Sequence, residues 1–408
     1  MKRKILIFSL AYYPKHIGGA EVAIKEITDR LPFHNYEFHL VCNRFDSTLR
    51  KEETIGNVTV HRIGLTTKNP VMADLKKLPL HLNKIIYQWL AFYNAKSLHQ
   101  QHGFDMVWAM MAHSTGIPAA KFKKSFPKVK YLLTLQEGDP LESIERKMKI
   151  FGRAFDEAFT RADMIQVIST FLGQWAKRKG FAGEPILIPN AVNTAHFASE
   201  YDEAKLREVR QDLNLADSDI ALVTTSRLVH KNAVDDVIRA LVFLPNHIKF
   251  IVFGTGPDET SLKVLITKLG LANRVQLRGQ INHADMPKYL KACNIFIRPS
   301  RSEGMGNSFV EAMAAGLPVI ATQVGGIADF LFDAKRNPDK GSTGWAVEVD
   351  SPVQIKEAVF EILDNPQVTS EVVARAKAIA MAKYDWNLIA QRMDKEVFQA
   401  LFTPGKVN

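Results

Sequence analysis

Two glutamates, Glu303 and Glu311, lie eight residues apart in the glycine-rich segment 302–326. Residues 304–308, Gly-Met-Gly-Asn-Ser, are typical of a loop that leads into a helix, here over 309–316. The start of a helix presents free backbone N–H groups and the positive end of the helix dipole, and both suit a phosphate. If the span between the glutamates were helical throughout, it would measure about 12 Å. That length suits a ligand with a diphosphate in the middle and hydroxyls at both ends, which is the form of a nucleotide-sugar.

Two cations, Arg227 and Lys231, follow the strand-like run Ile-Ala-Leu-Val-Thr-Thr at 220–225. In doubly wound sheets, ligands bind beyond the carboxyl ends of the strands. The arginine offers a fork for phosphate oxygens, and the lysine adds a mobile point charge. Together they can hold a diphosphate leaving group, although two exposed cations on a solvated loop would give the same pattern.

The first strand-like run of the chain leads to Gly18-Gly19 at the start of a helical stretch, 20–31. Paired glycines let a ligand approach the backbone closely, and the helix start faces that ligand. Their spacing is not the G-x-G-x-x-G of dinucleotide-binding domains. His113 and Glu137 each follow a further strand-like run and are candidates for contact with a sugar or an acceptor. A packed histidine and a helix cap are the alternatives.

Neither the cysteines nor the acidic pairs predict a metal or redox site. Cys42 and Cys293 lie in apolar surroundings in different halves of the chain, so we expect two free core thiols. The D-x-D triplet at 217–219 stands at the amino end of a strand, which indicates turn chemistry. We therefore predict no metal and no cofactor.

Short apolar runs alternate with helical stretches along almost the whole chain. This pattern is typical of parallel sheets covered by helices on both faces, and two successive sets of strands predict an α/β protein with two doubly wound, Rossmann-like domains. The expected strands are 4–9, 38–42, 58–63, 104–109, 130–135 and 164–169 in the first set, and 220–225, 248–253, 274–279, 294–299 and 317–322 in the second. A single helix is expected over 143–161.

At 408 residues the chain is too long for one typical core. A polar segment follows Pro189-Asn190 and marks the expected join. We predict one domain over 1–190, a second over 191–383, and a tail over 384–408 whose first part has helical spacing.

The net charge of +10 is confined to the N-terminal half. Residues 1–190 hold 28 Lys and Arg against 17 Asp and Glu, whereas the rest of the chain holds 25 against 26. Dense basic patches occur at 121–124 and 177–179. This asymmetry predicts an anionic partner for the first half. No zinc-finger or RNP-like motif points to nucleic acid, so none is predicted as a partner.

An anionic membrane surface is the partner that one segment favours. Residues 75–99 mix Lys, Trp and Tyr with aliphatic residues, as interfacial helices do, and Pro79 should mark a start or a kink. No apolar run approaches the ~18 residues that span a bilayer. We expect a cytoplasmic protein that is peripheral on the inner face of the membrane. A helix packed on the sheet, with its charges in water, is the alternative.

Segment 302–326 resembles the donor site of the glycosyltransferases of family 4, which have an E-x7-E signature and the GT-B fold. The matching residues are Glu303, Gly304, Gly306, Glu311, Ala312, Gly316, Pro318, Gly325 and Gly326. Gly18-Gly19, the Pro189-Asn190 hinge and Arg227 with Lys231 follow the family's order, so the resemblance covers nearly the whole chain. The chain departs from the family at Trp108 and Met110, where a His-x-His pair is common, at Ala191 and Asn193 after the hinge, and at Asn232.

The resemblance implies a GT-B protein with two domains that face each other across a cleft and a C-terminal helix that crosses back to the first domain. The N-terminal domain would bind the acceptor and the second domain the nucleotide-sugar. The implied activity is retaining transfer of a hexose-type sugar from a nucleotide-diphosphate sugar to a hydroxyl of a glycan or lipid-linked acceptor. Cell-envelope or surface glycan synthesis is the implied setting.

The resemblance also implies roles for single residues. Arg227, Lys231 and Glu303 would be catalytic, the two cations on the leaving phosphate and Glu303 on hydroxyls of the donor sugar. Glu311 would bind the ribose. The implied donor-binding residues are Gly18, Gly19, Gly304, Met305, Gly306, Asn307, Ser308 and Glu311.

Three other functions remain compatible with two doubly wound domains. A GT-B epimerase also cleaves a nucleotide-sugar, and it would turn over its donor without an acceptor. A dinucleotide-dependent oxidoreductase is disfavoured by the missing G-x-G-x-x-G. A non-catalytic carbohydrate-binding module is disfavoured by the presence of Arg227, Lys231 and Glu303.

Overall fold

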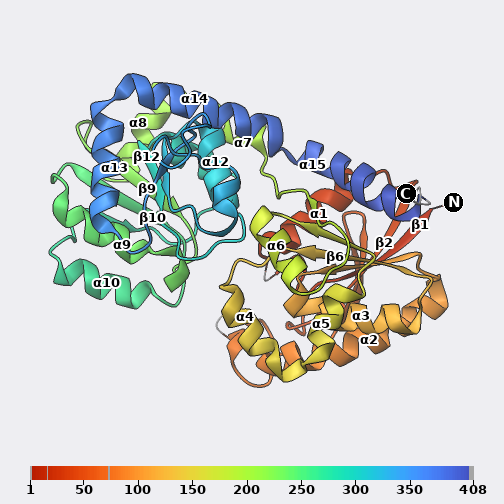
Figure 1. Ribbon diagram of the computed structural model, residues 1–408. Coiled ribbons are helices and arrows are strands. Elements are labelled where there is room, and N and C mark those ends of the chain that lie inside the picture. Colours follow the sequence, from red (N-terminus) through yellow and green to blue (C-terminus); the bar gives the residue numbers. More distant parts are fainter. Residues whose placement is uncertain (1, 16, 72–73, 404–408) are drawn as a thin grey trace. The chain divides into compact units, whose positions relative to one another are not determined.

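The computed structural model describes residues 2–15, 17–71 and 74–403. The chain forms two compact units, one of Met1–Asn190 with Trp386–Asn408 and the other of Ala191–Asp385. Each unit is built on a largely parallel sheet with helices on both faces (Figure 1). The predicted α/β class with two doubly wound sheets is therefore confirmed.

The sheet of the first unit has eight strands in the order β3-β4-β2-β1-β5-β6-β7-β8, and only β3 runs antiparallel to its neighbour. Its middle strands are buried on both faces because helices cover both sides of the sheet. The strands are β1 (Arg3–Phe8), β2 (Tyr36–Asn43), β3 (Glu52–Ile55), β4 (Val58–Ile63), β5 (Met106–Met110), β6 (Lys130–Leu135), β7 (Met164–Val167) and β8 (Ile186–Leu187).

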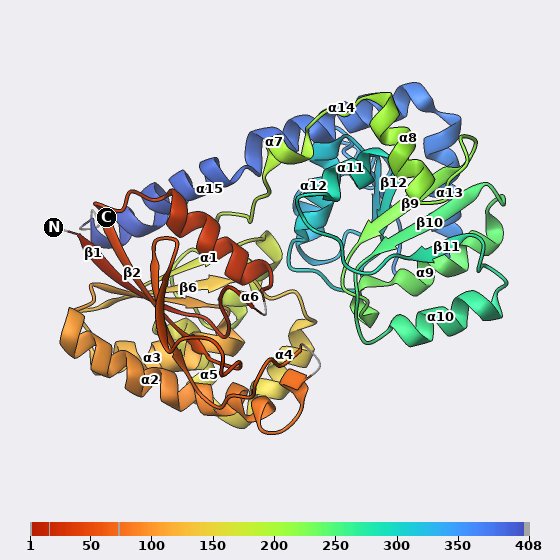
Figure 2. The same cartoon turned by 180° about the vertical axis from the view of Figure 1, so that it is seen from behind.

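Helices of the first unit form a layer on each side of this sheet (Figure 2). The layer that contains α1 also holds the C-terminal helices, and the opposite layer holds α2, α3 and α5. Their bounds are α1 (Gly19–Arg30), α2 (Asn83–His102), α3 (Ile117–Ser125), α4 (Leu141–Met148), α5 (Arg153–Thr160), α6 (Thr170–Arg178), α15 (Trp386–Arg392) and α16 (Ala400–Phe402). A π-helix, Met393–Gln399, joins α15 to α16.

The C-terminal segment packs onto the first unit, as expected of a helix that crosses back. The hydroxyl of Tyr36 on β2 donates a hydrogen bond to Asp394, and Arg392 Nη2 donates to the carbonyl of Leu187 at 3.0 Å. The ring of Phe398 lies against Trp108 of β5, with 5.3 Å between the ring centroids. The segment therefore completes the apolar cover of the sheet.

The sheet of the second unit has six parallel strands in the order β11-β10-β9-β12-β13-β14. The strands are β9 (Ile220–Thr225), β10 (Ile248–Phe253), β11 (Val275–Leu277), β12 (Ile295–Arg298), β13 (Val319–Ala321) and β14 (Trp345–Ala346). The helices are α7 (Thr194–Phe197), α8 (Glu203–Asp212), α9 (Val234–Ala240), α10 (Glu259–Lys268), α11 (Met286–Lys291), α12 (Asn307–Ala315), α13 (Pro352–Asp364) and α14 (Pro366–Lys383).

The structure corrects one predicted helix and confirms smaller expectations. The stretch 143–161 is not continuous, because Gly152 adopts a φ of +49° and separates α4 from α5. Pro79 marks a start as predicted, since a short 3₁₀ turn at Leu80–Leu82 follows it and runs into α2. Cys42 and Cys293 are buried free thiols, and burial raises the pKa of each to about 12.

Candidate active site

The loop that leads into α12 requires a glycine at its last position. Gly306 adopts a φ of +88° and caps the helix. A Cβ on this residue would lie 2.6 Å from the ring of Phe309 and 2.7 Å from Nη2 of Arg298. Gly306 therefore lets the backbone turn tightly and leaves the N–H groups of the first helical turn facing outward from the strand ends.

A buried arginine, Arg298, organises this loop. It is the last residue of β12, and its guanidinium donates to Glu303 Oε2 and to Ser308 Oγ, both at 2.7 Å. It also lies 4.2 Å from the centroid of the Phe309 ring. Burial lowers the pKa of Arg298, while the charges of Glu303 and Glu311 oppose that shift. One side chain thus fixes both the catalytic candidate Glu303 and the start of α12.

Glu303 is held on its backbone as well as on its carboxylate. Its Oε1 accepts a hydrogen bond from Gly304 N at 3.0 Å, and its carbonyl accepts from Gly326 N at 3.2 Å. A Cβ on Gly325 would lie only 1.9 Å from that carbonyl oxygen. The Gly325-Gly326 turn therefore packs directly on the backbone of Glu303, and only glycine permits this approach.

The remaining donor-binding candidates of this loop differ in what they present. Glu311 lies one turn inside α12, and its Oε1 is 3.0 Å from Nε2 of the exposed His283. Asn307 Nδ2 donates weakly to the carbonyl of Ala191 at 3.4 Å. Met305 is 2% exposed, so its side chain belongs to the core and only its backbone is available to a ligand.

The loop after β9 carries Arg227 and Lys231 at the carboxyl end of its strand, as the sequence indicates. Arg227 is exposed, whereas Lys231 is partly buried in a short 3₁₀ turn, His230–Asn232. A Cβ on Gly254 would lie 1.8 Å from the carbonyl oxygen of Ser226. A Cβ on Gly256 would lie 2.2 Å from that of Leu228. Because these two glycines have no side chain, the loop after β10 can pack directly against the backbone on either side of Arg227.

Unpaired polar atoms gather at this same edge of the sheet. Among the residues that the structure describes, the hydroxyls of Thr225, Ser226 and Ser300 are buried without a hydrogen-bond partner. They lie at or just beyond the carboxyl ends of β9 and β12. Buried polar groups are normally satisfied, so an unpaired group in a native fold indicates a place for a ligand or ordered water.

Arg301 connects the two loops that carry the predicted catalytic residues. Its backbone N–H donates to the carbonyl of Lys231 at 2.7 Å, and its guanidinium pairs with Asp235 at 2.9 Å and Asp350 at 2.6 Å. Asp236 also accepts from this guanidinium, at 3.1 Å. Burial raises the pKa of Asp236 to about 6, against the effect of Arg301. Arg301 therefore positions the Lys231 turn relative to the Glu303 loop.

The first unit places Gly18 and Gly19 at the start of α1. Gly18 caps the helix, and its N–H donates to the carboxylate of Glu21 at 2.7 Å. A Cβ on Gly19 would have no heavy atom of a described residue within 4 Å. No described neighbour therefore requires glycine at position 19, and the space beside it remains open to a ligand.

His113 and Glu137 form a hydrogen-bonded pair at the ends of β5 and β6. His113 Nδ1 lies 3.3 Å from Glu137 Oε1, which also accepts from Ala112 N at 2.7 Å. The side chain of Glu137 is fully buried, whereas that of His113 is one-third exposed. Met111, just before the π-helix that carries His113, adopts a φ of +69°. Such local strain is often found at functional sites. The buried carboxylate of Glu137 therefore orients the more exposed ring of His113.

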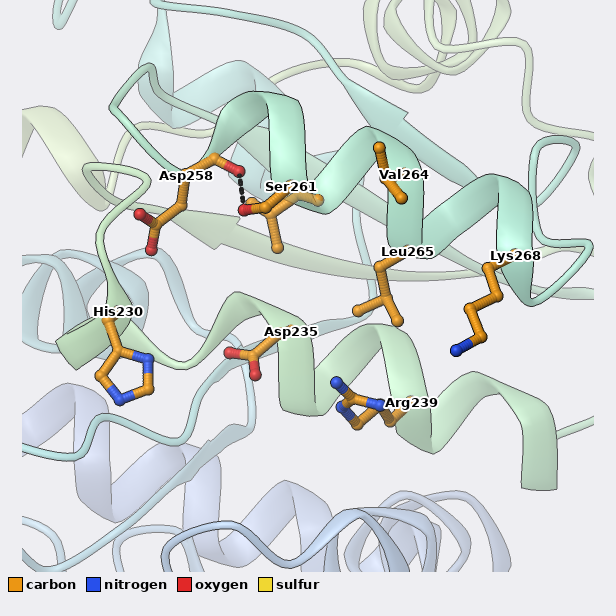
Figure 3. Close-up of a pocket in the computed structure, with 9 residues that line it drawn as sticks. His230, Asp235, Arg239, Asp258, Ser261, Val264, Leu265 and Lys268 are labelled. Atoms are coloured by element: carbon orange, nitrogen blue, oxygen red, sulfur yellow. Dashed lines mark hydrogen bonds between the residues drawn. The ribbon is translucent and has the colours of Figure 1, made fainter.

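One surface hollow of the second unit contains none of the predicted donor residues. It measures about 300 Å³ and lies between α9 and α10, where Asp235 and Arg239 face Ser261 and Leu265 (Figure 3). His230 borders it, beside the Lys231 turn. The hollow therefore lies beside the turn that carries Lys231, and the residues that line it do not include those of the α12 loop.

The D-x-D triplet behaves as a turn. Asp219 Oδ2 accepts from the backbone N–H of Ala216 at 2.9 Å, which closes the turn before β9. The sequence signalled neither Arg298 nor Arg301 as functional. The sequence feature that could have pointed to Arg298 is a charged residue at the end of the apolar run Ile-Phe-Ile. The feature that could have pointed to the close packing of the loop after β10 on the loop after β9 is the pair Gly254 and Gly256.

Comparison with known proteins matches two family models to successive parts of the chain. The model of the family "Glycosyltransferase Family 4" matches residues 17–196, and that of "Glycosyl transferases group 1" matches residues 206–380. The uncharacterized glycosyltransferase MJ1178 of Methanocaldococcus jannaschii is 27% identical over 94% of each chain.

Two further proteins add to this comparison. A GDP-mannose-dependent monoacylated α-(1-6)-phosphatidylinositol monomannoside mannosyltransferase of Corynebacterium glutamicum is 27% identical over 55% of this chain and 60% of its own. The solved sucrose-phosphate synthase of Thermosynechococcus elongatus superposes with a TM-score of 0.78 at 21% identity, over 98% of this chain and 99% of its own. Its likeness concerns the fold alone. The chain belongs to family 4 of the glycosyltransferases and is a glycosyltransferase with the GT-B fold.

Proposed function

We propose that this enzyme transfers a hexose-type sugar, with retention at the anomeric carbon, from a nucleotide-diphosphate sugar to a hydroxyl of a glycan or lipid-linked acceptor. The observation that carries the proposal is Glu303 clamped by Arg298 beside the open start of α12. The Corynebacterium relative is GDP-mannose-dependent and acts on a lipid-linked acceptor by name, which supports both substrate classes. We place the reaction in cell-envelope or surface glycan synthesis.

The chemistry requires charge stabilisation on a departing diphosphate. The bond from the anomeric carbon to the phosphate oxygen breaks, the bond to the acceptor oxygen forms on the same face, and the acceptor proton passes to the leaving phosphate. Arg227, Lys231 and the N–H groups at Gly306 would stabilise the growing charge by electrostatic preorganisation. Glu303 would hold donor-sugar hydroxyls, and no metal is needed in this scheme.

The other predicted contacts keep their proposed roles with one revision. Glu311 would bind the ribose, and Gly18 and Gly19 would approach the donor with their backbone. His113 presents Nε2 on a ring that Glu137 orients, so we assign it the contact with sugar or acceptor and assign Glu137 only the positioning.

A thermal-shift screen of UDP-, GDP- and ADP-sugars tests the donor class. A ligand that binds only the folded state raises the melting temperature by mass action. We expect one nucleotide-sugar to raise it more than its free sugar does. If NAD or a flavin stabilises the chain and no nucleotide-sugar does, the proposed donor is wrong.

We also propose that an anionic membrane surface binds the outer face of α2. The inner face of α2 packs in the core through Tyr87, Ala91 and Ala95. The outer face exposes a stripe of large apolar side chains, namely Ile85 (49%), Trp89 (53%), Leu90 (40%) and Tyr93 (61%). The alternative of a simply packed helix thus accounts for only one of its faces.

The charges around this stripe suit an anionic surface. Lys121 Nζ of α3 lies 4.3 Å from the Trp89 ring and 5.7 Å from the Tyr93 ring. α2 and α3 contain five lysines and no Asp or Glu. Each basic residue near an anionic membrane contributes about 1 kcal/mol. Lys123 is excluded from this count because it pairs with Asp163 at 2.7 Å. Among the described residues, no helix is long and apolar enough to cross a bilayer.

Liposome co-sedimentation tests this surface. Binding should require anionic lipid, weaken with salt, and fall in a Lys84→Glu/Lys96→Glu variant and in a Trp89→Ala/Tyr93→Ala variant. The matched control is Lys263→Glu/Lys268→Glu on α10, which makes the same change in charge at exposed sites. Equal recovery with neutral and anionic liposomes, or an equal loss in the control, would contradict the membrane proposal.

A further inference from the structure

A cluster of histidines and glutamates lies in the first unit, apart from the loops at the carboxyl ends of its strands. Glu37 and His39 are near the amino end of β2, and His102 is the last residue of α2. The ligand atoms of these three residues all lie within 4.8 Å of one another. Glu37 and His39 are two positions apart on one strand, and His102 lies 63 positions beyond His39, so the sequence gives no metal-ligand spacing. Folding alone assembles them.

The surroundings of His39 are built in the manner of a supported metal ligand. His39 Nδ1 lies 3.0 Å from Nε2 of His61 on β4, and His61 Nδ1 lies 3.0 Å from Oε2 of Glu52 on β3. A chain of this kind fixes the ring and directs the other nitrogen of His39 toward Glu37. Metal-bound histidines almost always have such a partner on the second ring nitrogen.

The contacts along this chain leave one position that a cation can fill. Three contacts occur in series, Glu37 to His39 at 3.0 Å, His39 to His61 and His61 to Glu52, and each needs one hydrogen. Two neutral imidazoles carry two N–H groups. If His39 and His61 use theirs on the second and third contacts, Nε2 of His39 faces the carboxylate of Glu37 with a lone pair. Either a third proton or a metal cation at these two atoms then satisfies both of them.

We infer that Glu37, His39 and His102 bind a divalent transition-metal ion of the zinc type, which links β2 to the end of α2. Imidazole nitrogens with one carboxylate oxygen are a common zinc ligand set, and water would complete a tetrahedral shell. The C-terminal end of a helix favours positive charge, which helps at His102. Lys4 brings an opposing charge, since its Nζ donates to the carbonyl of His102 at 3.0 Å. The carboxylates of Glu37 and Glu52 contact His39 and His61 at 3.0 Å and carry the negative charges of the cluster.

This ion is a structural one, separate from the proposed transfer reaction. The prediction of no metal therefore still applies to the donor site. The inferred metal ion lies in the first unit. Removal of the ion should lower the stability of the chain without a change in donor specificity.

Metal titration of the untagged, chelator-treated chain tests the inference. Zn²⁺ by calorimetry and Co²⁺ by its visible absorption should each bind once per chain, and Zn²⁺ should raise the melting temperature. His102→Ala and Glu37→Gln, both at partly exposed positions, should weaken binding by tenfold or more. Glu52→Gln, whose side chain is 67% exposed and touches no metal, should weaken it by about tenfold through His61.

His34→Ala is the matched control, because His34 is exposed and removes one histidine without touching the cluster. It should bind Zn²⁺ like the wild type. The inference is overturned if the wild type binds no Zn²⁺, or if His102→Ala and Glu37→Gln bind it as tightly as His34→Ala does, which would mean an adventitious ion only.

Discussion

At the scale of single residues, the proposed donor site contains one buried cation that holds one carboxylate. Arg298 is 6% exposed, and its two hydrogen bonds fix Glu303 and Ser308 before any ligand arrives. Breaking a buried ion pair from one side leaves the other charge unpaired and is strongly destabilising. The pair therefore preorganises Glu303 and makes its position insensitive to solvent.

Glu311→Gln tests the proposed ribose contact. The substitution keeps the shape of the side chain and removes its charge, so a charge-assisted hydrogen bond worth roughly 1.5–3 kcal/mol becomes a neutral one. Donor affinity measured by calorimetry should fall about tenfold. His283→Ala is the control, since His283 is exposed and its Nε2 lies 3.0 Å from Glu311 Oε1. Unchanged affinity in Glu311→Gln would remove this residue from the site.

Two glycines should respond in opposite ways to alanine. Gly306→Ala places a Cβ against Phe309 and Arg298 at a φ of +88°, so the melting temperature should fall by several degrees. Gly19→Ala meets no described neighbour within 4 Å, so it should leave the melting temperature unchanged while it lowers turnover. A stable and fully active Gly19→Ala enzyme would show that no ligand approaches this backbone.

The sequence proposed the charged and glycine residues of the candidate site but not the arginines beside them. Glu303, Glu311 and Gly306 could be named from their type and spacing in the glycine-rich segment. Arg298 could not be assigned, because a lone arginine after an apolar run shows no spacing, and Arg301 could not, because its partners Asp235 and Asp350 come from other segments of the chain. Met305 was predicted as donor-binding, but packing places its side chain in the core.

At the scale of elements, the loops after β9 and β12 act together through Arg301. Burial lowers the pKa of this guanidinium, but its hydrogen bonds to Asp235 and Asp350 outweigh burial, so its pKa lies above the ordinary value. Asp236 is the residue of this cluster whose ionised form is disfavoured by burial. Its pKa rises from the usual 3.8 to about 6, chiefly because of burial and despite Arg301.

The cluster predicts a pH dependence of stability. The pKa of Asp236 is higher in the folded than in the unfolded chain, so the folded state binds the proton more tightly. This residue should therefore stabilise the wild type as the pH falls from 7 toward 4. Asp236→Asn lacks the titration, and its free energy of unfolding relative to the wild type should be greatest above pH 7, by at most about 3 kcal/mol.

Chemical denaturation of Asp236→Asn and wild type at pH 7.5 and pH 4.5 measures this difference. Asp235→Asn serves as a control, because it removes a neighbouring carboxylate that makes a bidentate contact with the same Arg301. The same gap between Asp236→Asn and wild type at both pH values would contradict the assignment.

Secondary structure was predictable wherever an apolar run was long enough to be buried on both faces. Each of the eleven expected strands overlaps an observed one. The strands outside this set, β3, β8 and β14, are short edge strands of four, two and two residues. The expected helix over 143–161 failed at Gly152, whose left-handed backbone no periodicity reveals.

At the scale of the whole molecule, charge and ligand chemistry are divided between the two units. The excess of basic residues lies in 1–190, and the first unit also carries the apolar stripe of α2. The second unit carries the α12 loop, Arg227 and Lys231. This division of charge agrees with our proposal that the first unit binds an acceptor at an anionic surface and the second unit binds the donor.

The most direct test of this account is the acceptor-dependent release of nucleoside diphosphate from the nucleotide-sugar that stabilises the chain most. Wild-type enzyme with a total lipid and glycan extract should release it far faster than without the extract. Arg227→Ala and Lys231→Ala, at saturating donor, should each lose more in kcat than in donor affinity, because the phosphate charge grows in the transition state. Release at the same rate without any acceptor, or full kcat in both variants, would contradict the account.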